Sequence, residues 1–206
     1  LMYAPPTALW ALYWLIREKK ILSYYLLGLS GILGLGLSSF FLLPALVEQR
    51  LIQIENLVSN YSNYRAHFVT LRQLFLSRFW GDGPSIFGPV DGMSFQIGWP
   101  HWWILAPLII GGILWLRKYE KRQNLIILSG LIALFLFSSF LAHPRSILIW
   151  ERIPIMSFVQ FPWRFLGLSI FFISFAAGAF AKTNLFAKKL LYVFFFISTI
   201  ALNFKY

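Results

Sequence analysis

Long apolar stretches alternate with polar ones along the whole chain, and the type of basic residue changes with them. Apart from Lys205, every lysine lies in one of three short polar segments, 17–20, 117–122 and 182–189. The two other polar stretches, 48–100 and 143–164, contain arginine and no lysine. Because loops on the cytoplasmic side of a membrane are enriched in basic residues, this alternation predicts a chain that weaves through a membrane with its lysine segments in the cytoplasm.

Six apolar stretches resemble membrane-spanning helices. A hydrocarbon core of about 30 Å is crossed by a helix of about 20 residues, and no stretch shows the strict alternation of a barrel strand. The predicted spans are residues 3–16, 21–47, 99–116, 125–142, 163–181 and 190–204, with outer loops at 48–98 and 143–162. The sequence therefore predicts an all-α integral membrane protein, a single polytopic domain with one large helical outer loop.

Composition favours a membrane protein over one that binds nucleic acid. The chain is 59% hydrophobic and 12% charged, whereas soluble domains have about 25% charged residues. Its net charge of +11 is concentrated in the lysine segments beside the predicted spans, where anionic lipid headgroups attract basic residues. Membrane lipids, and not nucleic acid, are the predicted partners. The chain begins inside an apolar stretch, so we expect it to be an internal piece of a longer protein.

The first part of the large loop, 48–79, is predicted to be a helix with two arginines on one aromatic face. At about 100° per residue, one stripe joins Tyr61, Arg65, Phe68, Arg72 and Leu76. Arg65 and Arg72 would then point the same way. They either snorkel to headgroups and pair with Glu48 and Glu55, or they clamp a phosphate group, for which guanidinium is well shaped.

The rest of the large loop carries turn residues and two carboxylates. Asp82 and Asp91 are expected to cap turns, or else to act as a general base or as metal ligands near the outer surface. The three histidines, His67, His101 and His143, do not have the spacing of a helical zinc motif. The sequence identifies no cofactor, and binding of a divalent metal remains an open alternative.

The second outer loop ends at Arg164, where the fifth predicted span begins. A charge at the edge of the apolar region is costly unless it is paired or solvated, so Arg164 either snorkels or has a specific partner. It is the third candidate for binding a phosphate. No nucleophile elbow, Walker loop or dinucleotide-binding glycine pattern occurs in the chain.

Several loop segments carry a family resemblance. They are NYRAHF (63–68) with LRQLF (71–75), WG (80–81) with DGMSFQIGWPHW (91–102), and FPWRFL (161–166). These segments resemble a family of bacterial membrane proteins labelled 6-pyruvoyl-tetrahydropterin synthase-related, over about residues 44–178. In and beside them, structural roles in the loops are expected for Trp80, Gly81, Gln96, His101, Gln160, Pro162 and Trp163.

The label does not describe an activity, because the pterin synthase is a soluble zinc enzyme whose histidine arrangement this chain lacks. The resemblance instead implies an architecture similar to GT-C type glycosyltransferases, which move a sugar from a polyprenyl-phosphate carrier to an acceptor outside the cytoplasm. Their catalytic carboxylate usually lies in the first external loop, which we expect upstream of this chain. The resemblance therefore does not make Asp82 or Asp91 the base, and Arg65, Arg72 and Arg164 would bind the carrier phosphate.

The sequence is compatible with three alternative functions. The leading hypothesis is a fragment of a GT-C-like glycosyltransferase in the cell membrane, with its large loop outside the cytoplasm and a polyprenyl-phosphate sugar as substrate. The alternative is a non-catalytic scaffold or an export component of envelope polymer assembly. A transporter is disfavoured, because the predicted spans have no ionisable residue near mid-membrane, where coupling groups usually lie.

Overall fold

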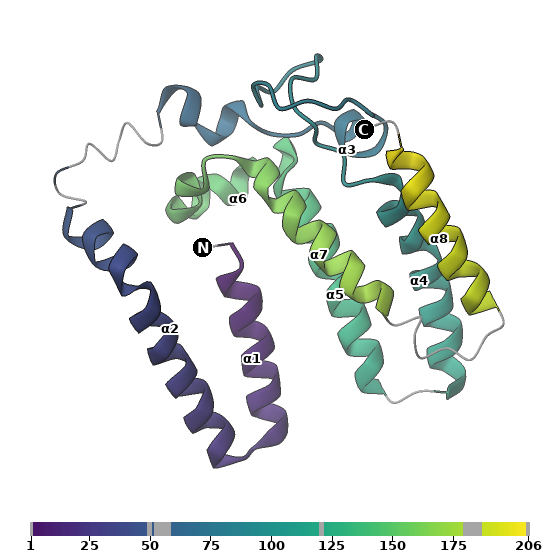
Figure 1. The fold of residues 1–206 in the computed structure, drawn as a ribbon, viewed down its shortest axis with the longest axis horizontal. Coiled ribbons are helices and arrows are strands. Elements are labelled where there is room, and N and C mark those ends of the chain that lie inside the picture. Colours follow the sequence, from purple (N-terminus) through teal and green to yellow (C-terminus); the bar gives the residue numbers. More distant parts are fainter. Residues whose placement is uncertain (1, 49–50, 52–58, 120–121, 179–186, 205–206) are drawn as a thin grey trace. The chain divides into compact units, whose positions relative to one another are not determined.

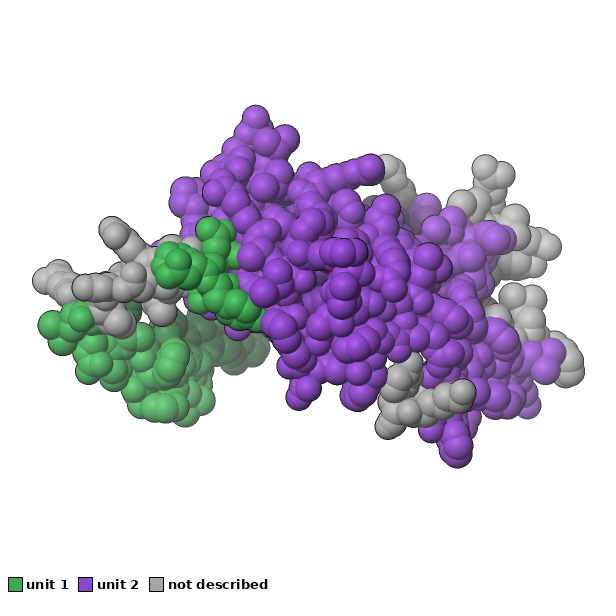
Figure 2. All heavy atoms as spheres, turned by 90° about the horizontal axis from the view of Figure 1, so that it is seen from above, with its two compact units in different colours: residues 1–63 green, residues 64–206 purple. Residues whose placement is uncertain are grey.

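The computed structural model describes residues 2–48, 51, 59–119, 122–178 and 187–204, and these form an all-helical structure (Figure 1). The described residues contain no β-sheet, and their one isolated bridge joins Asp82 to Met93. The chain divides into two compact units, Leu1–Asn63 and Tyr64–Tyr206, which Figure 2 colours separately.

The first unit is a hairpin of two helices, α1 (Ala4–Glu18) and α2 (Ile21–Glu48). Lys19 ends α1 in a left-handed conformation with φ 49°, and its N–H donates to the carbonyl of Leu15. The hydroxyl of Tyr24 in α2 donates to the same carbonyl at 3.2 Å. Neither helix contains a buried residue. Most of their apolar side chains are exposed, and others, such as Trp14 and Leu15, are half-buried.

In the part of the chain that the structure describes, two helices are long and apolar enough to cross a membrane: Ile21–Glu48 in the first unit and Asn124–Leu141 in the second. Shorter apolar helical segments are Pro162–Ala177 and Tyr192–Leu202. Length and composition alone define these candidates, which give weak support to a membrane location.

The second unit is a bundle of four long helices with a layer of loops at one end (Figure 1). The long helices are α4 (Trp99–Tyr119), α5 (Arg122–Leu141), α7 (Phe165–Ala177) and α8 (Ala187–Asn203). Two short helices, α3 (Leu71–Phe75) and α6 (Ile147–Arg152), lie in the loop layer, defined here as residues 64–98 and 143–164. Each of the six predicted spans therefore coincides with a helix, with boundaries shifted by a few residues.

The centre of the bundle is the contact between α5 and α7. Phe135 of α5 and Ile173 of α7 are fully buried. Beside them Ser139 of α5 donates to the hydroxyl of Ser169 of α7 at 3.0 Å, with both serines buried. Small hydroxyl residues of this kind allow helices to approach closely and hydrogen-bond across their interface.

The prediction of a helix over 48–79 is wrong for residues 59–79, and with it the prediction of a large helical outer loop. Residues 49–50 and 52–58 lie outside the described residues. Beyond them the chain forms two 3₁₀ turns, Asn60–Ser62 and Tyr64–Ala66, then an extended segment, and then the five-residue α3. The consecutive residues His67, Phe68 and Val69 are 0%, 3% and 0% exposed. A surface helix cannot bury three successive side chains, because they point to different sides.

Candidate functional site

Tryptophans at the start of α4 hold α3 in place. The indole N–H of Trp99 donates to the carbonyl of Phe75 at 2.9 Å, and that of Trp102 donates to the carbonyl of Leu74 at 3.1 Å. The rings of Phe75 and Trp102 also pack 4.2 Å apart. The last carbonyls of a helix have no partner within it, so these bonds stabilise the end of a helix too short to be stable alone.

A second anchor is Trp150 of α6, which is almost fully buried. Its indole N–H donates to the carbonyl of Leu141 at 3.1 Å, and Tyr64 stacks on its ring at 5.1 Å. Next to it the backbone N–H of Val69 donates to the carbonyl of Ala142 at 2.8 Å. The two outer loops are thereby joined to each other and to the end of α5.

A capping box begins α3. The Thr70 hydroxyl accepts from the backbone N–H of Gln73 at 3.2 Å, and the side-chain oxygen of Gln73 accepts from the backbone N–H of Thr70 at 2.8 Å. Sequence analysis missed this feature, although a threonine followed three residues later by glutamine is a recognisable signal. The capping box fixes the start of the helix that carries Arg72.

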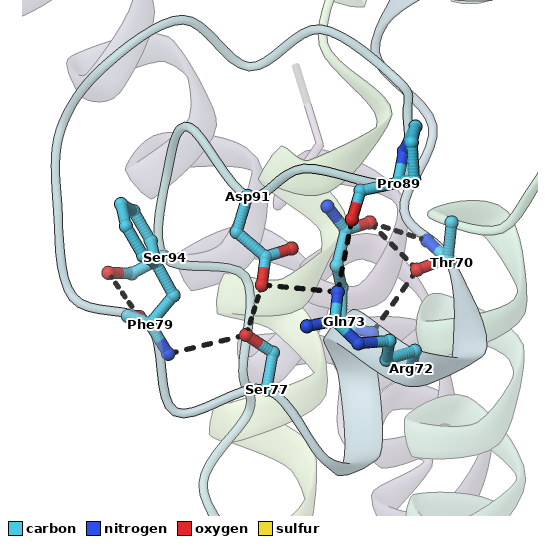
Figure 3. Close-up of polar contacts among 8 residues, drawn as sticks. All are labelled: Thr70, Arg72, Gln73, Ser77, Phe79, Pro89, Asp91 and Ser94. Carbon is cyan, nitrogen blue, oxygen red and sulfur yellow. Dashed lines mark hydrogen bonds and ion pairs between the residues drawn. The ribbon is translucent and has the colours of Figure 1, made fainter.

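Arg72 and Asp91, proposed separately from the sequence, lie in one polar cluster (Figure 3). The Arg72 guanidinium is 3.5 Å from Oδ2 of Asp91 and donates to the carbonyl of Pro89 at 3.2 Å. Ser77 donates to the same carboxylate oxygen at 2.5 Å. The Asp91 side chain is 7% exposed and that of Arg72 is 61% exposed, so the cluster presents a cation to solvent and a carboxylate to the interior.

Five buried side-chain atoms have no hydrogen-bond partner among the described residues. They are Nε2 of Gln73, Oδ1 of Asp91, Nε2 of Gln96, Nδ1 of His101 and Nε1 of Trp163. All five belong to the loop layer or to the first turn of α4. Buried polar atoms are normally paired, so each unpaired one requires an explanation, such as a bound ligand or water. This concentration identifies the loop layer as the candidate functional site.

Arg65 does not share a helix face with Arg72, as the predicted helix required. Its guanidinium donates to Glu151 of α6 at 2.8 Å and lies 5.5 Å from the ring centre of Tyr64. The hydrogen bond to Glu151 raises the pKa of the Arg65 guanidinium above its ordinary value. The two arginines therefore belong to two separate ion pairs. Both guanidinium groups are largely exposed, whereas the carboxylate of Asp91 is buried.

Arg164 stabilises an unusual turn. It donates to the carbonyl of Val159 at 3.0 Å, and its guanidinium lies 4.8 Å from the ring centre of Phe161. Between these residues Gln160 has a positive φ of 64°. Gln160, predicted to have a structural role in the loop, thus lies at the backbone position that defines this turn. Pro162, also predicted, is buried and begins the 3₁₀ turn Pro162–Arg164.

The remaining residues predicted to be structural lie around the tip of the loop and the start of α4. The exposed Asp82 forms the isolated bridge with Met93, and the backbone N–H of Gly81 donates to the hydroxyl of Ser94 at 2.9 Å. A Cβ on Gly81 would lie 2.7 Å from the ring of Phe79. The neighbouring Trp80 is 70% exposed. The role of Asp82 as a turn cap stays a prediction.

The three histidines lie in different surroundings. His67 is fully buried, with Nδ1 2.8 Å from the Ser85 hydroxyl, a contact that no sequence spacing indicated. The ring of His101 packs against Gly98, whose φ is 101°. Burial lowers the pKa of His143, and the charge of Arg145 lowers it further. Within the described ranges, no three histidine, aspartate or glutamate residues are grouped as a metal site would require.

No family model, curated protein or solved structure matches this chain.

Proposed function

We propose that this chain is part of a six-span membrane protein of the 6-pyruvoyl-tetrahydropterin synthase-related family. In this proposal it belongs to a GT-C-like glycosyltransferase that uses a polyprenyl-phosphate-linked sugar at the outer face of the cell membrane. Six helices at the predicted positions support the topology.

The arrangement of the second unit supports the proposed orientation. The end of α4, the start of α5, the end of α7 and the start of α8 lie opposite α3 and α6 (Figure 1). Lys118 near the end of α4 and Lys188 and Lys189 at the start of α8 therefore lie at one end of this unit, and the arginine loops lie at the other. This is the distribution that the positive-inside rule describes for a protein whose large loop faces away from the cytoplasm.

The observation that carries the proposal is that each of the three predicted arginines in the loop layer is both anchored and exposed. Arg65 is fixed by Glu151, Arg72 by Asp91, and Arg164 by the carbonyl of Val159. All three side chains remain exposed. Cations held in place before the ligand arrives stabilise a phosphate without first having to be ordered.

The proposed reaction needs such cations. An acceptor hydroxyl attacks the anomeric carbon of the sugar, the bond from that carbon to the phosphate oxygen breaks, and the carrier phosphate leaves with the electron pair. The arginines would neutralise the charge that develops on this phosphate. A carboxylate base would accept the hydroxyl proton, and the proposal assigns that base to another part of the protein.

A non-catalytic scaffold is the second candidate, and a specific observation favours it. Each arginine already has an acceptor, and the Arg65–Glu151 pair joins the two outer loops directly. Cross-links of this kind would be sufficient to hold an envelope complex together without any turnover.

Binding of the carrier separates the two candidates. Native mass spectrometry of the purified full-length protein would compare polyprenyl phosphate with phosphatidylglycerol, for wild type, for Arg65→Ala with Arg72→Ala, and for Arg152→Ala as a matched exposed-arginine control. The transferase predicts preferential retention of polyprenyl phosphate, reduced about tenfold or more in the double variant and unchanged in the control. Retention no better than phosphatidylglycerol, or equal losses in both variants, would favour the scaffold.

A further inference from the structure

The side chains of Gln73 and Asp91 each have one buried atom with unused hydrogen-bonding capacity. Gln73 is 2% exposed, and the Asp91 side chain is 7% exposed. The oxygen of Gln73 is used by the capping box, but its Nε2 has no partner in the described part of the chain. Oδ2 of Asp91 is used by Arg72 and Ser77, but its Oδ1 has none there either.

The two unused atoms are chemically complementary. Nε2 of Gln73 is a donor, and Oδ1 of an ionised Asp91 is an acceptor. Arg72 links them, because it is the chain neighbour of Gln73 and the ion-pair partner of Asp91, and Figure 3 shows all three in one cluster. A hydroxyl group accepts one hydrogen bond and donates another, so it satisfies both atoms at once, whereas a phosphate cannot donate to Asp91.

We infer that Gln73 and Asp91 bind a hydroxyl group of a sugar, with the exposed Arg72 beside them for the phosphate to which that sugar is attached. This deepens the proposed function and depends on it for the identity of the carrier. The hydroxyl site is distinct in chemistry from the three cations, because it consists of a neutral donor and a buried acceptor. It also gives Asp91 a binding role in place of the catalytic one considered from the sequence.

Two conservative variants test the site without breaking the capping box. Gln73→Glu keeps an oxygen that can accept from Thr70 and replaces the unused donor by an acceptor. Asp91→Asn keeps an oxygen for Ser77 and Arg72 and replaces the unused acceptor by a donor. The double variant exchanges the two roles and keeps the net charge, so a hydroxyl, which both donates and accepts, fits it again.

Two pairs of lipids provide the probes for the purified full-length protein. The first pair is polyprenyl-phosphate glucose and polyprenyl phosphate. The second is glucosyl diacylglycerol and diacylglycerol, which contains no phosphate. Retention by native mass spectrometry gives a preference for the glucosylated member of each pair. A lost hydrogen bond is expected to reduce this preference about three- to tenfold in each single variant, and the double variant is expected to restore it.

The outcomes separate this inference from the proposed function. If polyprenyl phosphate is retained no better than phosphatidylglycerol but the glucosyl preference in the diacylglycerol pair responds to the variants as described, the transferase fails and the hydroxyl site stands. If wild type prefers neither glucosylated lipid, or if the folded single variants keep the full preference, the site is overturned and the two atoms hold water only. Thermal unfolding of each variant establishes that it is folded.

Discussion

Arg164 donates to the backbone carbonyl of Val159 at 3.0 Å, and this same oxygen accepts the N–H of Phe161 at 2.7 Å. The second bond closes a three-residue turn around Gln160, with φ 64° and ψ −43°. These angles are close to those of the γ-turn with positive φ, which is rare and strained. The guanidinium therefore helps to hold a strained turn in the loop layer, next to the start of α7.

We predict that changes at Arg164 and Gln160 are energetically coupled. Arg164→Ala removes an exposed charged hydrogen bond and should destabilise the protein by about 1 kcal/mol. Gln160→Gly removes the conformational cost of a positive φ in the folded protein, about 1–2 kcal/mol. This gain is offset by about 0.4–1 kcal/mol, because glycine increases the conformational entropy of the unfolded chain. With the turn relaxed, the arginine should matter less. Thermal unfolding of both single variants and the double variant should show coupling of about 0.5 kcal/mol or more, and strictly additive effects would contradict it.

We predict that Trp150 is a principal anchor of the loop layer. Trp150→Ala removes a buried ring and should destabilise the protein by about 3–5 kcal/mol. Trp150→Phe keeps most of the packing and loses one hydrogen bond of about 1 kcal/mol. The carbonyl of Leu141 also accepts from Ser146 at 3.1 Å, so it is not left without a donor. Thermal midpoints and limited proteolysis of the loop layer would check this, and equal effects of the two substitutions would rule it out.

His143 should make stability depend on pH. Burial, and then the charge of Arg145, lower the pKa of the folded imidazole below its ordinary value, so the unfolded chain binds the proton more readily. The stabilisation is complete above the unfolded pKa of about 6.5 and is lost as pH falls through the folded value. His143→Asn keeps an acceptor for the N–H of Arg145, which His143 now binds at 3.2 Å. Unfolding at pH 5 and pH 7.5 should show a smaller difference for the variant, and an unchanged difference would refute the assignment.

The positions of the long helices were predictable because their signal is local. Each lies in an apolar stretch bounded by charged or turn residues, and backbone hydrogen bonding within such a stretch needs no information from elsewhere in the chain. The same reasoning failed for 59–79. There the conformation is set by contacts distant in sequence, such as the bond from Val69 to Ala142 and the stacking of Tyr64 on Trp150.

The candidate site also combines features that the sequence indicates with features that it does not. The exposure of Arg65, Arg72 and Arg164 follows from their charge, and their role in binding a phosphate stays a prediction. Their partners were not predictable, because Glu151 is 86 positions from Arg65 and Asp91 was considered for turn capping, catalysis or metal binding but not as an ion-pair partner. The predicted shared face of Arg65 and Arg72 depended on one continuous helix, and it disappears with that helix.

Substitutions at Arg65 and Glu151 distinguish a structural role of this ion pair from a role in binding the carrier phosphate. Their side chains are 56% and 41% exposed, and exposed ion pairs contribute little to stability. The raised pKa of Arg65 keeps it charged, so its contribution persists until the pH rises through that value. Arg65→Ala and Glu151→Gln should therefore each shift the thermal midpoint only slightly, at pH 6 and pH 9 alike.

Carrier binding should respond differently to the two substitutions. Arg65→Ala removes a cation that the proposed phosphate needs, so retention of polyprenyl phosphate should fall about tenfold. Glu151→Gln removes an anion that competes with the phosphate for the same guanidinium, so retention should be equal or higher. If the pair only joins the two outer loops, both variants would bind the lipid alike, because each breaks the same cross-link. Native mass spectrometry of the two variants side by side decides between these roles.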